Sequence, residues 1–273
     1  LVLGSRAASL AIEHPRVAAV TLTGSTPAGR KVAALAGSLL KKTVLELGGS
    51  DPYVVLEDAD LDLAVAACVT GRILNTGQSC IAAKRFIVPE TVRDDFETRL
   101  VDLMQRQRVG DPMLEEIEVG PMARADLRDE LHDQVVRSLQ AGARCLLGGE
   151  VPEGPGAFYP PTVLTDVTQG MAGYEEELFG PVAAVLPVAD EEEALRVAND
   201  TDFGLGAAVF TRDVARGEEI AAKRLQAGSC FVNAFVKSDP RLPFGGIKGS
   251  GYGRELGSFG IREFVNVKTV YVA

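Results

Sequence analysis

The sequence contains only two histidines, His14 and His132, and no tryptophan. Neither histidine lies in a catalytic or metal-binding motif, and we expect no metal site. A nucleophilic cysteine in this chain would therefore use a carboxylate as its base rather than an imidazole, which excludes most cysteine–histidine hydrolase patterns. The sequence points instead to an enzyme that combines a thiol with a carboxylate.

Further absences bear on location and partners. The four cysteines in 273 residues have no regular spacing, so we expect a reducing compartment and no disulfide framework. No apolar run reaches the ~18–20 residues that a membrane-spanning helix needs, and Leu1-Val2-Leu3-Gly4 is too short for a signal peptide. The net charge of −10 gives no electrostatic footprint for nucleic acid. We expect a cytoplasmic protein that binds neither membranes nor nucleic acid.

Cys80 differs from the other cysteines in its sequence context. It follows Asn75-Thr76-Gly77-Gln78-Ser79, a polar, turn-prone segment directly after a predicted helix. A cysteine presented in this way can act as a nucleophile, whereas the alternative is a buried, inert thiol. The other three lie on an alanine- and valine-rich helix face or inside apolar strands, and we expect them to be inert core residues: Cys68, Cys145 and Cys230.

Glu46 is a lone acidic residue in an apolar stretch, thirty-four positions before Cys80. The following Gly48-Gly49 pair allows another backbone segment to approach closely. Burial would raise the pKa of the glutamate towards the working pH, as a general base requires. The alternative is a strand glutamate that pairs with Lys41 or Lys42.

Strands and helices alternate along the chain. Residues 17–22 predict a strand, Ser25 and Pro27 the start of a helix that runs to about Leu40, and residues 43–47 the next strand. This order is a βαβ unit, the building block of a parallel sheet. Further strands are expected at residues 51–56, 85–88, 144–147, 182–188, 207–210 and 229–232, and further helices at residues 58–74, 91–106, 124–141, 191–199 and 213–225. The prediction is an α/β fold with a mostly parallel sheet and one boundary near residues 46–49.

Three other segments have distinctive compositions. Residues 148–161 are rich in glycine and proline and predict an exposed loop, and residues 245–253 hold five glycines and predict a flexible loop. Residues 263–272 are rich in β-branched side chains and predict a terminal strand. Such a strand needs a partner, either in its own sheet or in another chain, because its unpaired backbone groups would invite aggregation.

Several motifs occur in an order that resembles one known family. Residues 45–52 (LELGGSDP) and 75–80 (NTGQSC) look like the glutamate and cysteine signatures of the aldehyde dehydrogenase superfamily. Three further stretches match that family in the same order, at residues 176–181, 199–204 and 243–255. The resemblance covers essentially the whole chain. The GGSDP run, and Ser238-Asp239 with Arg241, further resemble the succinate-semialdehyde dehydrogenase branch.

The resemblance implies the α/β fold of that family's catalytic domain, with the end of a nucleotide-binding domain and a C-terminal oligomerisation strand. It assigns residues 1–46 to the remnant of the NAD(P)-binding domain, 47–255 to the catalytic thiol domain and 256–273 to oligomerisation. The expected assembly is a homodimer or homotetramer. Relatives carry a long additional N-terminal portion, so the chain is interpreted as a C-terminal fragment.

The resemblance also implies a mechanism. The Cys80 thiolate attacks the aldehyde carbonyl, hydride leaves to NAD or NADP, and Glu46 directs water onto the resulting thioester to release a carboxylic acid. The backbone N–H of Cys80 can donate to the oxyanion. In relatives the second donor is an asparagine from the N-terminal portion, and no residue here matches it.

Cofactor binding is likewise implied by the resemblance, because the sequence has no Gly-x-Gly-x-x-Gly fingerprint. Gly24 and Ser25 precede a predicted helix, whose N-terminus can hold phosphate. In the family this turn and Leu47 lie against the cofactor. Glu177 resembles the glutamate that binds the nicotinamide ribose, and Phe179 the aromatic residue that packs beside the nicotinamide.

Substrate recognition has three candidate residues. Arg241 and Ser238 can anchor a substrate carboxylate, since a guanidinium group binds a carboxylate at two points. Arg72 is the third candidate, with a surface position as its alternative. Many semialdehyde enzymes of the family carry an arginine six residues before the cysteine, where this chain has Leu74. The favoured substrate is succinate semialdehyde; the alternatives are an uncharged aldehyde, or an inactive subunit that only folds and associates.

Overall fold

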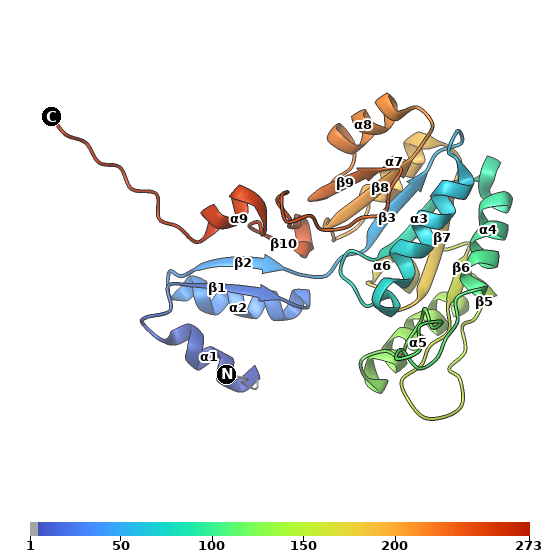
Figure 1. Cartoon of the computed structure of the whole chain (residues 1–273), viewed down its shortest axis with the longest axis horizontal. Helices are drawn as coiled ribbons and strands as arrows, with labels where there is room; N and C mark the ends of the chain where they lie inside the picture. The colour runs from blue at the N-terminus through green and yellow to red at the C-terminus, as the bar shows by residue number, and fades with distance from the viewer. Residues whose placement is uncertain (1–4) are drawn as a thin grey trace. The chain divides into compact units, whose positions relative to one another are not determined.

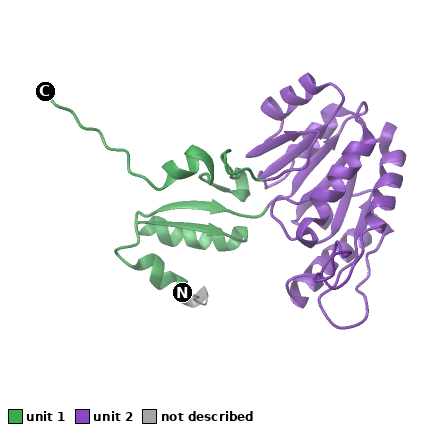
Figure 2. Cartoon of the chain, viewed as in Figure 1, with its two compact units in different colours: residues 1–48, 238–273 green, residues 49–237 purple. Residues whose placement is uncertain are grey.

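The computed structural model describes residues 5–273, and these residues form two compact units (Figure 2). The first unit contains the chain up to residue 48 together with residues 238–273, and the second contains residues 49–237. Residues 238–255 therefore belong with the N-terminal segment in space. The functional division into residues 1–46, 47–255 and 256–273 stays a prediction.

The first unit is built on a βαβ motif (Figure 1). Strands β1 (Ala19–Thr23) and β2 (Lys42–Glu46) pair in parallel, and helix α2 (Thr26–Ser38) connects them, as predicted. The two-residue strand β10 (Gly251–Tyr252) pairs antiparallel with the other edge of β2 and places Gly251 opposite Glu46. The remaining helices of this unit are α1 (Ser5–Glu13), a 3-10 helix (Lys248–Ser250) and α9 (Gly257–Glu263).

The second unit is a seven-stranded sheet in the order β5-β6-β7-β4-β3-β8-β9. All neighbouring strands pair in parallel except β5 and β6, so the predicted mostly parallel α/β fold is confirmed. The strands are β3 (Asp51–Val55), β4 (Ala83–Pro89), β5 (Arg144–Leu147), β6 (Thr162–Thr165), β7 (Val182–Val188), β8 (Gly206–Phe210) and β9 (Ser229–Val232). The helices are α3 (Leu61–Ile73), a 3-10 helix (Leu74–Gly77), α4 (Glu90–Gln105), α5 (Ala125–Gln140), α6 (Ala172–Glu175), α7 (Glu191–Asn199) and α8 (Val214–Lys223).

Helices cover both faces of this sheet, which explains why the central strands β3, β4, β7 and β8 are buried on both faces. Successive side chains of a strand point to opposite faces. Val54 of β3 therefore packs into a core that includes α5, α7 and α8, while its neighbours Tyr53 and Val55 pack into a second core that includes α3 and α4. Both cores are fully formed within the second unit.

Some predicted elements are wrong. Residues 264–273 hold no helix or strand, and Glu263 belongs to α9. The terminal valines and the tyrosine are exposed, with Val267 97% exposed. Composition favours a strand there, but within the described chain no neighbouring strand supplies the hydrogen bonds. The glycine-rich residues 245–253 are not simply a loop, since they contain a 3-10 helix and β10. Helices α1 and α6 and strand β6 were not predicted.

Among residues 5–273, no helix is long and apolar enough to cross a bilayer.

Candidate active site

Cys80 lies at the end of an unusual turn. Helix α3 ends at Ile73, and the next residues Asn75, Thr76 and Gly77 all adopt left-handed backbone conformations, with φ values of 54°, 57° and 71°. A β-branched residue such as Thr76 is rare in this region and its conformation costs on the order of 1–3 kcal/mol. The surrounding structure must therefore hold the turn in place.

Hydrogen bonds from several side chains hold this turn. The Arg72 Nη2 group donates to the Gly77 carbonyl at 2.6 Å, and Thr76 Oγ1 donates to the Gly120 carbonyl at 3.3 Å. The Asn75 side chain donates to the Gln78 carbonyl, and Gln78 Oε1 accepts from the backbone of residue 123. Arg72 is completely buried, so the surface position given as its alternative is wrong. In this unit Arg72 binds the backbone just before Cys80.

Lys84 is the charged group that contacts the Cys80 backbone. Its side chain is 0% exposed, and its ammonium group donates to the carbonyls of Cys80 at 2.9 Å, Ser79 at 3.1 Å and Ala82 at 3.3 Å. The same ammonium lies 3.4 Å from Glu177 Oε1. One buried cation thus joins the Cys80 turn to a carboxylate from the segment before β7.

The surroundings of Cys80 keep its thiol protonated. Burial raises the pKa of this half-buried group, Lys84 lowers it, and the negative charges of Asp51 and Glu177 raise it. A hydrogen bond from the backbone N–H of Ile81 also lowers the pKa of the thiol, as the smallest of these effects. The backbone N–H of Cys80 itself donates to no residue of the described chain. The pKa of the thiol is thus raised above its ordinary value, and Lys84 is the charged residue that opposes this shift.

These groups gather at the amino edge of the parallel sheet. Asp51 is the first residue of β3, Cys80 lies just before β4, and Glu177 lies just before β7. Because β3, β4 and β7 run in the same direction, their amino ends lie on one edge. Glycine at position 49 lets this edge close, since a Cβ there would lie 2.5 Å from the Cys80 carbonyl oxygen.

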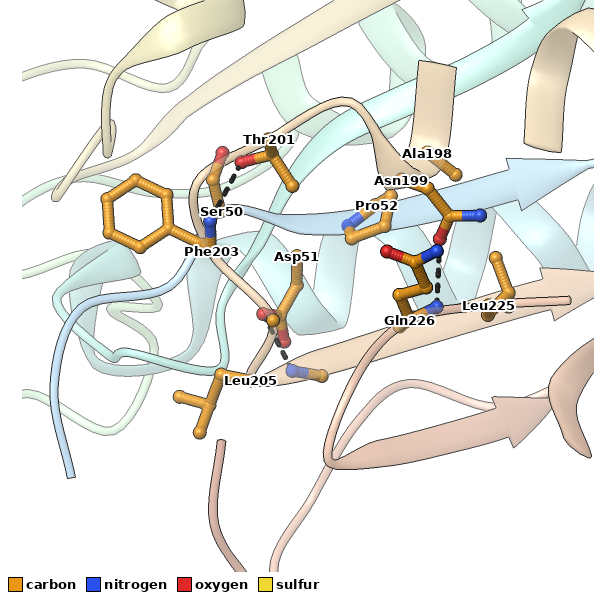
Figure 3. Close-up of a pocket in the computed structure, with 13 residues that line it drawn as sticks. Ser50, Asp51, Pro52, Ala198, Asn199, Thr201, Phe203, Leu205, Leu225 and Gln226 are labelled. Atoms are coloured by element: carbon orange, nitrogen blue, oxygen red, sulfur yellow. Dashed lines mark hydrogen bonds between the residues drawn. The ribbon is translucent and has the colours of Figure 1, made fainter. Parts of the chain in front are cut away.

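Asp51 is a buried carboxylate at the same edge. Its Oδ1 accepts a hydrogen bond of 3.0 Å from the Gly206 N–H at the start of β8, and its Oδ2 has no partner among the described residues. Burial raises its pKa to about 6, despite the opposing charge of Lys84. Figure 3 shows this carboxylate in a narrow pocket, where Asn199 also binds the N–H of Gln226.

The other cysteines differ from one another. Cys68 is buried, and burial raises the pKa of its thiol, as expected for an inert core residue. Cys230 is partly buried. Cys145 is exposed, so its predicted place in the core is wrong; strand β5 lies at the edge of the sheet, and this side chain faces outward.

Glu46, in the first unit, is a buried carboxylate without a partner. It is 2% exposed, and neither carboxylate oxygen accepts a hydrogen bond from residues 5–273. Burial and the negative charge of Glu255 raise its pKa to about 7, while Arg254 lowers it. Its predicted alternative, an ion pair with a nearby lysine, is wrong, because Lys41 binds the carbonyl of His14 and Lys42 pairs with Glu263.

The predicted cofactor residues lie in both units. In the first, Gly24 donates its N–H to the Glu46 carbonyl, Ser25 precedes α2 without a side-chain capping bond, and Leu47 is buried. In the second, Glu177 Oε1 accepts from the Gly49 N–H at 3.0 Å. Phe179, two residues on, is 37% exposed. This carboxylate and this ring are thus accessible, in contrast to the buried Asp51.

Two of the three predicted substrate residues, Arg241 and Ser238, are exposed. The Arg241 side chain is 86% exposed and pairs with Asp239, with 2.5 Å between Nη2 and Oδ2. Ser238 is also exposed. An inward-facing Arg241 would have supported a substrate carboxylate, and its outward position in this chain does not provide that support.

Comparison with known families decides the classification. The sequence model of the aldehyde dehydrogenase family matches residues 1–270 of this chain. The chain belongs to the aldehyde dehydrogenase family. Its motif order, from the segment around Glu46 to that around Glu255, is the feature by which the sequence resembled this family.

Individual aldehyde dehydrogenases are similar over almost the whole chain. Succinate semialdehyde dehydrogenase (NAD(P)+) Sad of Escherichia coli (strain K12) is 55% identical over 95% of this chain and 56% of that protein. Succinate-semialdehyde dehydrogenase (NADP(+)) 1 of Mycobacterium tuberculosis (strain H37Rv) is 52% identical over 100% of this chain and 60% of that protein. The chain spans little more than half the length of these relatives.

A solved structure of this family has the same fold. The crystal structure of succinic semialdehyde dehydrogenase from Streptococcus pyogenes, in complex with NADP+ as the cofactor, superposes with a TM-score of 0.97. It is 40% identical to this chain and is matched over 100% of this chain and 60% of that one.

Two residues of the candidate aldehyde dehydrogenase site were missed from the sequence. The sequence predicts Asp51 only as the first residue of a strand, and it predicts that the following strand begins at Arg85, one residue after Lys84. A signal was present, because Lys84 and Arg85 are consecutive charges at the start of an otherwise apolar strand. Both are fully buried, and charged side chains are rarely buried unless they are paired.

Proposed function

We propose that this chain contributes the nucleophile and the general base to the NAD(P)-dependent oxidation of an aldehyde to a carboxylic acid. The observation that carries the proposal is the state of Glu46. A buried carboxylate that accepts no hydrogen bond from the described residues, and whose pKa is raised to about 7, can accept a proton from water near neutral pH. Membership of the aldehyde dehydrogenase family supports the same assignment.

In the proposed reaction, the Cys80 thiolate adds to the aldehyde carbon and forms a thiohemiacetal. The backbone N–H of Cys80, which has no partner in the described chain, donates to the oxyanion that develops. Loss of hydride from the same carbon leaves a thioester on the sulfur. Glu46 then takes a proton from water as the water attacks, and the acid leaves while the thiol is regenerated.

Glu177 and Phe179 are the residues that suit a nicotinamide cofactor. Glu177 Oε1 is held by the Gly49 N–H, while Oε2 accepts no hydrogen bond from a described residue. The side chain is 22% exposed, so this oxygen can accept from ribose hydroxyls. A bound nicotinamide would supply the hydride acceptor. Gly24, Ser25 and Leu47 are proposed to lie against the rest of the cofactor.

We propose succinate semialdehyde as the substrate, on the strength of relatives with that name at 52–55% identity. Arg241 and Ser238 remain the candidates for its carboxylate. Loss of one charge-assisted hydrogen bond costs about 1.5–3 kcal/mol. Arg241→Ala should therefore reduce activity on succinate semialdehyde by roughly tenfold to a hundredfold, with little effect on butanal, an uncharged aldehyde of the same chain length. An unchanged ratio of the two activities would place the anchor elsewhere.

The enzymatic proposal is tested by reduction of NADP+ or NAD+ in the presence of each aldehyde. The protein that carries this sequence should form reduced cofactor with succinate semialdehyde, and Cys80→Ser should abolish the reaction. Cys230→Ser is the matched control, because this partly buried thiol has no proposed role. A chain that associates but gives no reduced cofactor with either aldehyde would favour a purely structural subunit.

A further inference from the structure

Lys84 is a buried charge that the proposed reaction does not use. Its side chain is 0% exposed, and burial lowers the pKa of its ammonium group. Burial of a charge is costly unless the charge is paired and hydrogen-bonded. A structural role alone is well served by an apolar side chain at the start of a strand, so the contacts of this ammonium are informative.

The ammonium group carries two kinds of contact at once. On one side it donates to three carbonyls of the Cys80 turn, those of Ser79, Cys80 and Ala82. On the other side it lies 3.4 Å from the carboxylate of Glu177. Glu177 approaches from the segment before β7, and it also accepts the N–H of Gly49. The cation thus bridges the backbone that presents the thiol and a partly exposed carboxylate.

The charges around this cation act on the thiol with opposite signs. Lys84 favours the Cys80 thiolate, whereas Asp51 and Glu177 disfavour it. Arg72 is the other buried cation of the turn, and its positive charge lowers the pKa of the Lys84 ammonium. Asp51 is enclosed and fixed by the Gly206 N–H, so Glu177 is the one of these two anions that a ligand can reach.

We propose that Lys84 is a positioning residue that links the negative charge of Glu177 to the ionisation of the Cys80 thiol. While Glu177 is a free carboxylate, it neutralises the ammonium and the thiol stays protonated. When a ligand donates hydrogen bonds to this carboxylate, the carboxylate offsets less of the positive charge of the ammonium. The ammonium then favours the thiolate of Cys80 more strongly. The inference rests on the proposed role of Cys80 as the nucleophile, and it ties activation of the thiol to occupation of the Glu177 subsite.

The test is the pH dependence of Cys80 alkylation by iodoacetamide, followed by mass spectrometry of the labelled peptide. The thiolate is the reactive form, so the rate reports its population. A nearby charge changes such an ionisation by roughly tenfold or more. Lys84→Met should move the rate profile to higher pH and slow labelling at pH 7. Glu177→Gln, which keeps the oxygen that accepts from Gly49, should move the profile to lower pH and speed labelling.

The double variant separates a link through Lys84 from a direct effect of Glu177. If the lysine transmits the effect, Glu177→Gln should change the profile much less in the Lys84→Met background. Profiles that stay in place, that move in the same direction in both single variants, or that respond to Glu177→Gln equally in both backgrounds would overturn the proposal. If Lys84→Met does not fold, Lys84→Gln takes its place in the single and double variants, and an unmoved or raised profile for Glu177→Gln contradicts the expected sign in any background.

Two controls accompany this experiment. Cys145 is an exposed thiol in the same chain, and its labelling should be unaffected by either variant. Lys223→Met removes an exposed lysine that pairs with Glu219 on α8, and it should leave the Cys80 profile unchanged. The assay contains neither aldehyde nor cofactor. Failure of the link would therefore be distinguishable from failure of the proposed oxidation.

Discussion

Gly77 lies so close to Gly180 that no side chain fits between them. A Cβ at position 77 would lie 2.4 Å from the Gly180 carbonyl oxygen, and Gly77 has a left-handed φ of 71°. Gly180 belongs to the segment that carries Glu177 and Phe179 before β7. The turn that presents Cys80 and the segment that presents Glu177 are therefore in direct backbone contact.

Gly77→Ala should destabilise the chain by at least about 1–2 kcal/mol, the cost of a left-handed alanine, with the steric overlap added to it. It should also disturb the Cys80 turn and slow iodoacetamide labelling. Urea denaturation followed by circular dichroism measures the first effect. The control is Gly37→Ala in α2, where a Cβ would meet nothing within 4 Å and alanine favours the helix. Equal stability changes in the two variants would contradict this account of Gly77.

Arg85→Lys should be destabilising even though the charge is kept. The buried guanidinium donates to the carbonyls of Ser50, Val197 and Ala198 at 3.0–3.1 Å, and it joins β4 to the end of α7. A single ammonium cannot reproduce these three directions, and each lost bond from a charged group costs about 1.5–3 kcal/mol. Arg196→Lys, at an exposed position, should change the free energy of unfolding by less than about 0.5 kcal/mol.

The free energy of unfolding should depend on pH through Glu46. Its pKa is about 7 in the folded chain against an ordinary value of 4.5, so between these values the folded state binds a proton that the unfolded state has lost. Stability should therefore fall as the pH rises from about 4.5 through 7. Glu46→Gln should reduce the difference in stability between pH 5 and pH 8 by up to about 3 kcal/mol.

Asp51 acts in the same direction, because its pKa is also raised, to about 6. Asp51 is present both in the unsubstituted chain and in the Glu46→Gln variant. The comparison of these two proteins therefore isolates the contribution of Glu46. Urea denaturation at the two pH values is the measurement. An unchanged pH dependence in Glu46→Gln would mean that the folded carboxylate titrates normally.

Residues 264–273 are proposed to pair with a second copy of the chain in a homodimer or homotetramer. They are exposed, rich in valine and without a strand partner in the described residues. A chain that ends at Glu263 keeps α9 and the ion pair between Glu263 and Lys42. Light scattering should show a smaller assembly for this shortened chain, and a soluble oligomer of unchanged size would contradict the proposal.

The sequence predicted the alternation of elements well, because apolar periodicity and turn residues are local signals. The βαβ unit that ends at Glu46 and the parallel sheet around Cys80 were both predicted. Strand β6 was missed because it follows a glycine- and proline-rich stretch that hides its short apolar run. The predicted terminal strand is absent from the single chain because β propensity describes a side chain on a paired surface, and no pairing partner exists for it among the described residues.

The candidate site was less accessible to sequence reasoning wherever it depends on tertiary contacts. The burial of Arg72 depends on the Gly77 carbonyl, which a left-handed turn brings towards it. Lys84 is paired by Glu177, from a segment more than ninety positions later in the chain. No local pattern encodes these distances. The usual rule for parallel sheets places ligands at the carboxyl ends of strands, whereas Cys80 and Asp51 lie at the amino ends of β4 and β3.

The most direct test of the proposed oxidation is to look for an acyl group on Cys80. The enzyme that carries this sequence, with Glu46→Gln, is mixed with succinate semialdehyde and NADP+, and the reduced cofactor and the Cys80 peptide are followed together. We predict one burst of reduced cofactor and a succinyl thioester that accumulates on Cys80, because hydride transfer survives while hydrolysis loses its base. Steady turnover at the unsubstituted rate without an acyl group, or an acyl group on another residue, would contradict the roles given to Cys80 and Glu46.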